Sequence, residues 1–141
     1  MREHLVNLAL KLVGCPYIWG GQNPWVGLDC SGFIIWIYQV FGLLPSGDWT
    51  AATLYQGLNQ TGVGTVHDLV PGDLVYYGAD IAHLTHVMLY AGADLVVGAS
   101  GGGHLTTTRE EAARKGAMVK VKPWNYRADA RVFGRVKFPG E

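Results

Sequence analysis

The sequence lacks an excess of either charge. Lysine and arginine together number 11 and aspartate and glutamate also number 11, so the formal net charge of the 141 residues is zero. A protein that binds nucleic acid or an anionic membrane normally presents a basic face, and the chain has no run of like charge that could form one. We therefore expect neither nucleic acid nor a membrane as a partner.

Long hydrophobic runs are also absent. No stretch of the sequence is long enough to cross a bilayer as a helix. The opening segment MREHLVNLALKLVGCPY places Arg2, Glu3, His4 and Lys11 among its apolar residues, which interrupts the apolar core that a signal peptide needs. We expect synthesis in the cytoplasm without a signal peptide, and delivery by another route if the target lies outside the cell.

Cysteine is scarce, since the chain has only Cys15 and Cys30. Two cysteines in a chain of this length do not make a disulfide framework. They are not spaced as Cys-x-x-Cys, so a zinc site built on paired cysteines is not expected. We interpret both as free thiols and Cys15 as a small buried apolar residue.

Apolar sequence, by contrast, is sufficient for a core, because 49% of the residues are hydrophobic, and the length suits one domain spanning 1–141. Helical spacing and stop signals predict helices over 4–13, 30–41, from about Thr50, and over 108–116, the last with a capping box at Thr108 and Glu111. A loop is predicted over 17–29 and a turn at LPSGD (44–48). Short apolar runs predict strands over 71–78, 85–92 and 94–100 and at MVKVK and RVFGRVKF, with a tight turn at AGAD (91–94) between the runs 85–92 and 94–100. Helices followed by a largely antiparallel sheet indicate an α+β domain.

The stretch GLDCSGFIIWIYQVFG (27–42) places Cys30 at the start of a helix without charged residues. Asp29 can cap this helix. A cysteine in the first helical turn lies near unpaired backbone N–H groups and the positive end of the helix dipole, which favour the thiolate. The same N–H groups could hold an oxyanion during acyl transfer. An inert, buried cysteine fits the local pattern as well.

A nucleophilic cysteine needs a base, usually a histidine that the fold brings near it. His86 opens the apolar run HVMLYAG, where the end of a strand would hold its ring rigidly. His83 is the rival, although it lies in an expected loop, and a histidine that only ends a strand is the alternative for His86. We interpret His4 and His67 as surface residues.

Five segments of the chain occur in an order that resembles a known family. They are PYIWGG (16–21), DCSGFI (29–34), GLLP (42–45), LVPGDLVYY (69–77) and HVMLYAG (86–92). The chain is similar in these motifs to the NlpC family of papain-like bacterial cell-wall cysteine peptidases. The resemblance implies a single papain-like domain over 1–141, in which N-terminal helices pack on a mainly antiparallel sheet and the nucleophile begins a buried helix. It also implies hydrolysis of peptidoglycan stem peptides, typically between D-glutamate and a diamino acid, without a metal or cofactor.

The resemblance also implies the role of individual residues. Cys30 matches the nucleophile and His86 the general base. Tyr17 matches a tyrosine of the active-site groove that helps to polarise the scissile carbonyl, with packing in the loop as its alternative role. Asp29 and Ser31 match positions that bind the main chain and free amine of the substrate. Local chemistry agrees, because a carboxylate suits an ammonium group and a phenol can donate to an oxyanion.

The pattern departs from the family at one position. The family carries a third polar residue that orients the base, and counting from His86 places Gly98 there, which has no side chain. A backbone carbonyl, a water or Ser100 could take over, or His104 in the loop SGGGH could fold back; otherwise the domain only binds or builds structure. Loss of a third group usually lowers the rate without abolishing the chemistry. Because Cys30 and His86 are both present, we favour an active enzyme.

These observations favour a cysteine endopeptidase whose partners are peptidoglycan stem peptides. One alternative is a non-catalytic structural or binding module of a phage tail or of a cell-wall assembly. Another is an amide or thioester hydrolase whose substrate is not part of the cell wall. Since no leader is expected, delivery would depend on a phage or prophage tail, a holin or a secretion system. Delivery by a tail would make phage tail proteins partners.

Overall fold

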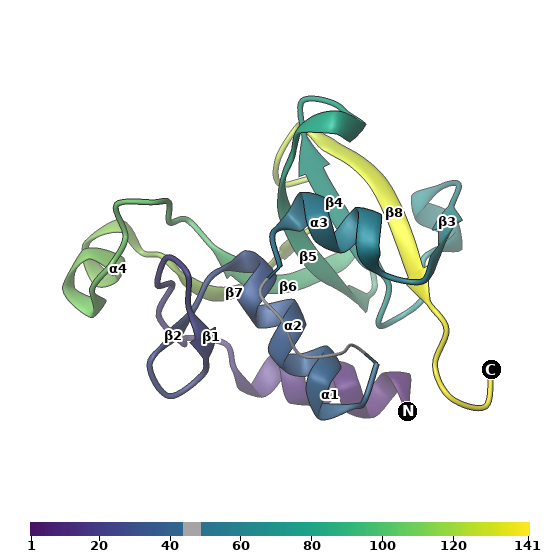
Figure 1. Ribbon diagram of the computed structural model, residues 1–141, viewed down its shortest axis with the longest axis horizontal. Coiled ribbons are helices and arrows are strands. Elements are labelled where there is room, and N and C mark those ends of the chain that lie inside the picture. The colour runs from purple at the N-terminus through teal and green to yellow at the C-terminus, as the bar shows by residue number, and fades with distance from the viewer. Residues whose placement is uncertain (44–48) are drawn as a thin grey trace.

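The computed structural model describes residues 1–43 and 49–141 and shows helices packed on an antiparallel sheet (Figure 1). The helices are α1 (Arg2–Lys11), α2 (Cys30–Val40), α3 (Ala51–Gly57) and α4 (Arg109–Lys115), with 3₁₀ turns η1 (Val66–Asp68) and η2 (Ile81–His83). The strands are β1 (Gln22–Asn23), β2 (Gly27–Leu28), β3 (Gln60–Val63), β4 (Leu74–Gly78), β5 (Leu84–Gly92), β6 (Leu95–Ser100), β7 (Met118–Pro123) and β8 (Ala130–Val136). The predicted α+β class is confirmed, β1 to β3 were not predicted, and the turn predicted over 44–48 lies outside the described residues.

The main sheet has the strand order β3-β8-β4-β5-β6-β7, and each neighbouring pair is antiparallel. β5 lies between β4 and β6, and Tyr77 of β4 pairs with His86 near the start of β5. The tight turn predicted between β5 and β6 is present, with Ala93 and Asp94 both at positive φ. Strand β5 therefore holds His86 within the sheet interior rather than at an edge strand.

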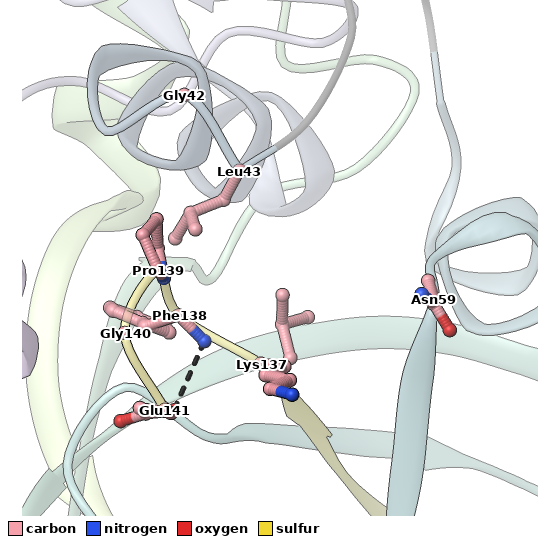
Figure 2. Close-up of a pocket in the computed structure, with 9 residues that line it drawn as sticks. Gly42, Leu43, Asn59, Lys137, Phe138, Pro139, Gly140 and Glu141 are labelled. Carbon is pink, nitrogen blue, oxygen red and sulfur yellow. Dashed lines mark hydrogen bonds between the residues drawn. The ribbon is translucent and has the colours of Figure 1, made fainter.

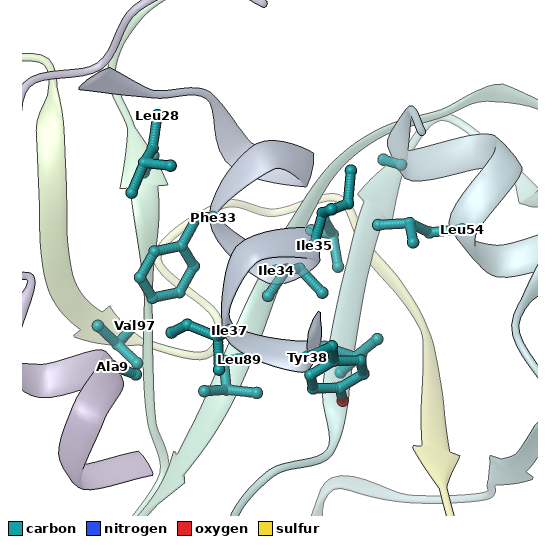
Figure 3. Packing of buried hydrophobic residues seen from close by; sticks show 14 of the residues in the cluster. Ala9, Leu28, Phe33, Ile34, Ile35, Ile37, Tyr38, Leu54, Leu89 and Val97 are labelled. Atoms are coloured by element: carbon teal, nitrogen blue, oxygen red, sulfur yellow. The ribbon is translucent and has the colours of Figure 1, made fainter. Parts of the chain in front are cut away.

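Helix α2 packs its apolar side chains on one face of this sheet. Phe33, Ile34 and Ile37 are completely buried, and Figure 3 shows Ile37 beside Leu89 and Val97 of the sheet. Burying one such side chain contributes about 1.5–3 kcal/mol. The packing fixes the position of the helix and therefore the place of its first turn, where Cys30 lies.

The opposite face of the sheet has a core of its own. This second core is formed by Leu69, Val75, Tyr77, Met88, Tyr90 and Val96, with Trp124 and Tyr126 packed against it. Side chains alternate along a strand, so His86 shares this face with Met88. The segment that covers His86 is thus the connection between β7 and β8, and not a helix.

Helix α4 begins and ends where the sequence predicts, whereas α1 begins and ends two residues before the predicted 4–13. The Thr108 hydroxyl accepts a hydrogen bond from the Glu111 N–H at 3.1 Å, and Gly116 ends α4 in the left-handed conformation with φ 64°. Thr50 caps α3. Among the residues that the structure describes, no helix combines the length and apolarity needed to cross a membrane.

Candidate active site

The start of α2 is fixed by hydrogen bonds from Asp29. One carboxylate oxygen, Oδ1, accepts from the Gly32 N–H at 2.7 Å and from the Ser31 hydroxyl at 3.3 Å. The other, Oδ2, accepts from the Gly20 N–H at 2.9 Å. Asp29 is therefore the predicted helix cap, and it also ties the preceding loop to the helix. Cys30 is held between these contacts.

Cys30 faces both a helix end and the strand that carries His86. The backbone N–H groups of Cys30, Ser31 and Val87 hydrogen-bond the sulfur and act to lower its pKa. Burial and the neighbouring Asp29 carboxylate outweigh them and raise the pKa of the Cys30 thiol to about 11. The expectation that the helix start favours the thiolate was thus wrong in its net direction. The contact with Val87 places the sulfur beside the residue that follows His86.

His86 is buried on β5 and hydrogen-bonded through one ring nitrogen. Its Nε2 lies 2.8 Å from the Tyr126 hydroxyl oxygen, and its ring lies 5.3 Å from that of Tyr77. Burial, with a smaller effect of Arg127, lowers the pKa of His86 to about 3, while Asp129 acts in the opposite direction. At neutral pH the resting site therefore contains a neutral imidazole and a neutral thiol.

A groove of about 240 Å³ opens at Cys30. It is lined by Tyr17, Trp19, Gly20, Asp29, Cys30, Ser31, Trp49, Thr50, Ala51 and Thr85. Four of the five predicted site residues line this groove, and the fifth, His86, follows the lining residue Thr85 in sequence. The structure thus brings the nucleophile and the predicted substrate-binding residues to one hollow.

Tyr17 is packed tightly in the wall of the groove. Its ring lies against the backbone of Gly102, where a Cβ atom would come within 2.3 Å of the ring. Burial, with smaller effects of the neighbouring Cys30 and Asp29, raises the pKa of Tyr17. The phenol therefore keeps its proton and can donate a hydrogen bond into the groove.

A second hollow, of about 490 Å³, lies near the C-terminus and is shown in Figure 2. It is lined by Gly42, Leu43, Asn59 and the last residues of the chain, 136–141. The Phe138 N–H donates to Glu141 Oε1 across it at 3.0 Å. None of the predicted site residues lines this hollow, so the groove at Cys30 is the candidate active site. Within 1–43 and 49–141, no cluster of three His, Cys, Asp or Glu residues is arranged to hold a metal ion.

The other histidines do not lie at the groove. His4 and His67 are exposed, as predicted. His83 is exposed on η2, where its Nδ1 lies 2.8 Å from Asp80. His104 packs its ring edge-on against Trp19, 6.3 Å away. Neither His83 nor His104 is hydrogen-bonded to His86.

Sequence reasoning missed Tyr126. Its hydroxyl bonds His86 Nε2 at 2.8 Å and the Ser100 hydroxyl at 2.9 Å, so Ser100 reaches His86 only through the tyrosine. The signal that could have drawn attention to it is the loop PWNYRAD (123–129), which places aromatic and charged residues between two strands. Tyr126 lies 40 residues from His86 in the sequence, and no sequence pattern links these two residues.

Comparison with known proteins gives one consistent result. The model of the NlpC/P60 family matches residues 14–122. The chain is 36% identical over 100 residues to the probable endopeptidase Rv2190c of Mycobacterium tuberculosis, covering 70% of this chain and 23% of that protein. It is 36% identical over 93 residues to the bifunctional muramidase/DL-endopeptidase CwlT of Bacillus subtilis, covering 64% and 26%. The chain thus spans about a quarter of the length of these relatives.

A solved structure matches over nearly the whole chain. The NlpC/p60 domain of the peptidoglycan hydrolase SagA superposes with a TM-score of 0.70 and 27% identity, and the match covers 98% of this chain and 99% of that one. The papain-like arrangement predicted from the sequence is therefore confirmed.

Proposed function

Because this chain belongs to the NlpC/P60 family, we propose that it is a cysteine endopeptidase that cleaves peptidoglycan stem peptides. The bond proposed is the amide between D-glutamate and a diamino acid. The observation that carries the proposal is the position of Cys30, which opens into a groove at a capped helix end while its sulfur meets the backbone of Val87, next to His86. The relatives named as endopeptidases, and the DL-endopeptidase activity in the name of CwlT, support it.

The proposed reaction is a two-step acyl transfer. Because thiol and imidazole are both neutral at rest, His86 takes the Cys30 proton as the sulfur attacks the amide carbon, so that the ion pair forms along the reaction path. The imidazolium then protonates the leaving amine, whose departure gives the acyl-enzyme. A water molecule, deprotonated by His86, releases the acyl group and restores the thiol.

Charge on the substrate would be met by groups already in place. The backbone N–H of Cys30 and the Tyr17 phenol can donate to the oxyanion that forms in each step. Asp29 and Ser31 line the groove, and the Asp29 carboxylate suits the free amine of a stem peptide. Because the hydrogen bonds of Asp29 also hold the helix start, its proposed substrate contact and its structural role are combined in one side chain.

Mass spectrometry of peptidoglycan and free stem peptides after incubation with the protein tests the proposal. We expect new fragments that identify the scissile bond, and a loss of at least about 10³-fold in rate for Cys30→Ala. Cys15→Ala is the matched control, because Cys15 is outside the groove and should leave the rate nearly unchanged. Intact peptides over several wall types would reject the endopeptidase in favour of a non-catalytic module or of a hydrolase with another amide or thioester substrate.

Delivery belongs to the proposal as well. A wall enzyme must reach the wall, and we infer that a phage or prophage tail, a holin or a secretion system carries it there. Phage tail proteins would then be partners. Co-purification of the chain with intact phage particles tests the first route, and its absence from such particles would reject it.

A further inference from the structure

His86 is oriented by a side chain from outside its own hairpin. Its Nε2 lies 2.8 Å from the hydroxyl of Tyr126, in the connection between β7 and β8. The same hydroxyl lies 2.9 Å from the Ser100 hydroxyl at the end of β6. The three polar groups form a chain, and one ring nitrogen, Nδ1, remains to exchange a proton with Cys30.

A side chain at position 98 could not supply this contact in the present packing. Position 98 lies on β6, beside β5, but it is a glycine. A Cβ atom there would lie 2.7 Å from Met88 Sδ, because the Met88 side chain fills the space over Gly98. Met88 thus fills the space that a side chain at position 98 would need, and the hydrogen bond to His86 Nε2 is made by Tyr126 instead.

The connection that carries Tyr126 is tied down on both sides. The Tyr77 hydroxyl donates to the Trp124 carbonyl at 2.7 Å, and the Trp124 N–H donates to the Asp94 carbonyl at 2.9 Å. Arg127 forms an ion pair with Asp129, and the Tyr126 ring meets that of Tyr77 edge-on. A side chain held in this way has little freedom to turn, so its hydroxyl can fix the orientation of an imidazole.

The hydrogen-bond chain also allows the tautomer of His86 that a general base needs. Tyr126 has one proton, which it can donate either to His86 or to Ser100. When it donates to Ser100, its oxygen is free to accept the proton of Nε2–H, and Nδ1 keeps the lone pair that a base needs. Burial also raises the pKa of Tyr126, so the phenol remains protonated.

We propose that Tyr126 is the positioning residue of His86, accepting from Nε2–H and donating to Ser100, in place of a side chain at position 98. The effect on catalysis rests on the proposed endopeptidase activity, whereas the tautomer of His86 does not. The substitution Tyr126→Phe keeps the ring and removes only the hydroxyl.

The experiment combines NMR with kinetics. In long-range ¹⁵N–¹H spectra at neutral pH we expect wild-type His86 to be protonated on Nε2, and Tyr126→Phe to shift this ring toward a mixture of tautomers. With stem peptide as substrate, kcat should fall about 10- to 100-fold, while KM changes less than about twofold. Ser100→Ala, which leaves Tyr126 in place, should give a smaller loss of a few fold.

Tyr76→Phe is the matched control, because it also removes a hydroxyl from a buried tyrosine of the sheet. Tyr76 belongs to the helix-side core, and its hydroxyl contacts Gln60. It should therefore leave the His86 tautomer and kcat unchanged. The groups that contact His86 or shift its pKa, and whose titration would appear in a pH profile, are Tyr77, Tyr126, Arg127 and Asp129.

Each outcome decides a different point. A folded Tyr126→Phe protein with the wild-type His86 tautomer would overturn the proposal. If Tyr126→Phe does not fold, the tautomer and kcat of Ser100→Ala decide instead, and wild-type values for both would overturn it. If the wild-type protein cleaves no wall peptide, the endopeptidase proposal fails, and the NMR result still accepts or rejects Tyr126 as the positioning residue.

Discussion

Cys30 and His86 are held in place in two different ways. The surroundings of Cys30 are mostly local, since Asp29 caps the helix and bonds Gly32 within the same turn. The surroundings of His86 are assembled from a distance, because Tyr126 lies 40 residues further along the chain. Local support can be recognised in a short motif, whereas long-range support exists only once two distant strands lie together.

This difference also predicts the effect of substitutions around Cys30 and around His86. Around Cys30 the close contacts are made by the short Asp29 side chain to backbone N–H groups and by the backbone of Gly21 against Gly32, and these groups have little room to move. Around His86 the close contacts are between side chains, and one side chain can take the place of another. Met88, for example, fills the space that a side chain at position 98 would need. Substitutions at the helix start should therefore disturb folding, and those around His86 should mainly change protonation and rate.

The largest effect is expected for Gly32→Ala. A Cβ atom there would lie 1.9 Å from the Gly21 carbonyl oxygen and 2.9 Å from Asp29 Oδ1, so the loop and the helix would have to separate. We expect the free energy of unfolding to fall by about 3 kcal/mol or more, measured by urea denaturation. Gly64→Ala is the control, because a Cβ there meets nothing within 4 Å. Equal effects of the two substitutions would show that the helix start is not rigid.

A second prediction concerns the pH dependence of stability at His86. Burial lowers the pKa of His86 from its ordinary 6.5 to about 3, so below pH 6.5 the unfolded chain binds a proton that the folded chain does not. The stability is present above that pH and is lost as the pH falls toward 3. Between pH 7 and pH 4, wild type should lose about 2–3 kcal/mol more than His86→Asn.

Urea denaturation at the two pH values measures this difference. His67→Asn, at an exposed histidine, should follow the wild type. Identical pH dependence of wild type and His86→Asn would mean that the folded protein accepts a proton at His86 easily. Water would then reach the His86 ring, and Tyr126 and its neighbours would not seal the ring from solvent.

The comparison also explains what could be predicted from the sequence. The helix at Cys30, its cap at Asp29 and the turn between β5 and β6 follow from residues adjacent in the chain, and all are present. The polar strand β3 and the two-residue strands β1 and β2 have no apolar periodicity to reveal them. Tyr126 could not be assigned, because its contact depends on how the connection between β7 and β8 crosses the sheet.

The direction of the Cys30 pKa was missed for a related reason. A sequence shows that a cysteine begins a helix, but it does not show how deeply the sulfur is buried. Here burial contributes most to the pKa, and the Asp29 charge acts in the same direction. The residue that the sequence correctly identifies as the cap thus opposes the thiolate that the helix start would favour.

Asp29→Asn separates these two effects. Asparagine still caps the helix through its single oxygen, but its NH2 group cannot accept from the Gly20 N–H as Oδ2 does, so stability should fall by about 1 kcal/mol, while loss of the carboxylate lowers the pKa of Cys30. The rate of iodoacetamide labelling of Cys30 at pH 7–8 should rise severalfold. Asp29→Ala should in addition lose about 1 kcal/mol of stability with the cap.

Asp80→Asn is the control for the charge effect. Asp80 also accepts a backbone hydrogen bond at the start of a short helix, from the Ala82 N–H at 2.9 Å, but it is absent from the groups that shift the Cys30 pKa. It should leave Cys30 labelling unchanged. An unchanged labelling rate in Asp29→Asn as well would mean that burial alone keeps the thiol protonated.

The smallest effect is expected for Gly98→Ala, at the position where the sequence departs from the family pattern. The added Cβ would meet Met88 Sδ at 2.7 Å but Met88 Cα only at 3.6 Å, and the end of a methionine side chain can move aside. We expect a loss of about 1 kcal/mol in stability and a kcat within about twofold of wild type, because Tyr126 orients His86 without help from position 98. Gly62→Ala on β3, with nothing within 4 Å, is the control. A loss of kcat beyond tenfold in a stable Gly98→Ala protein would mean that packing of Met88 over Gly98 supports His86 directly, and that the long-range support has a second, local part.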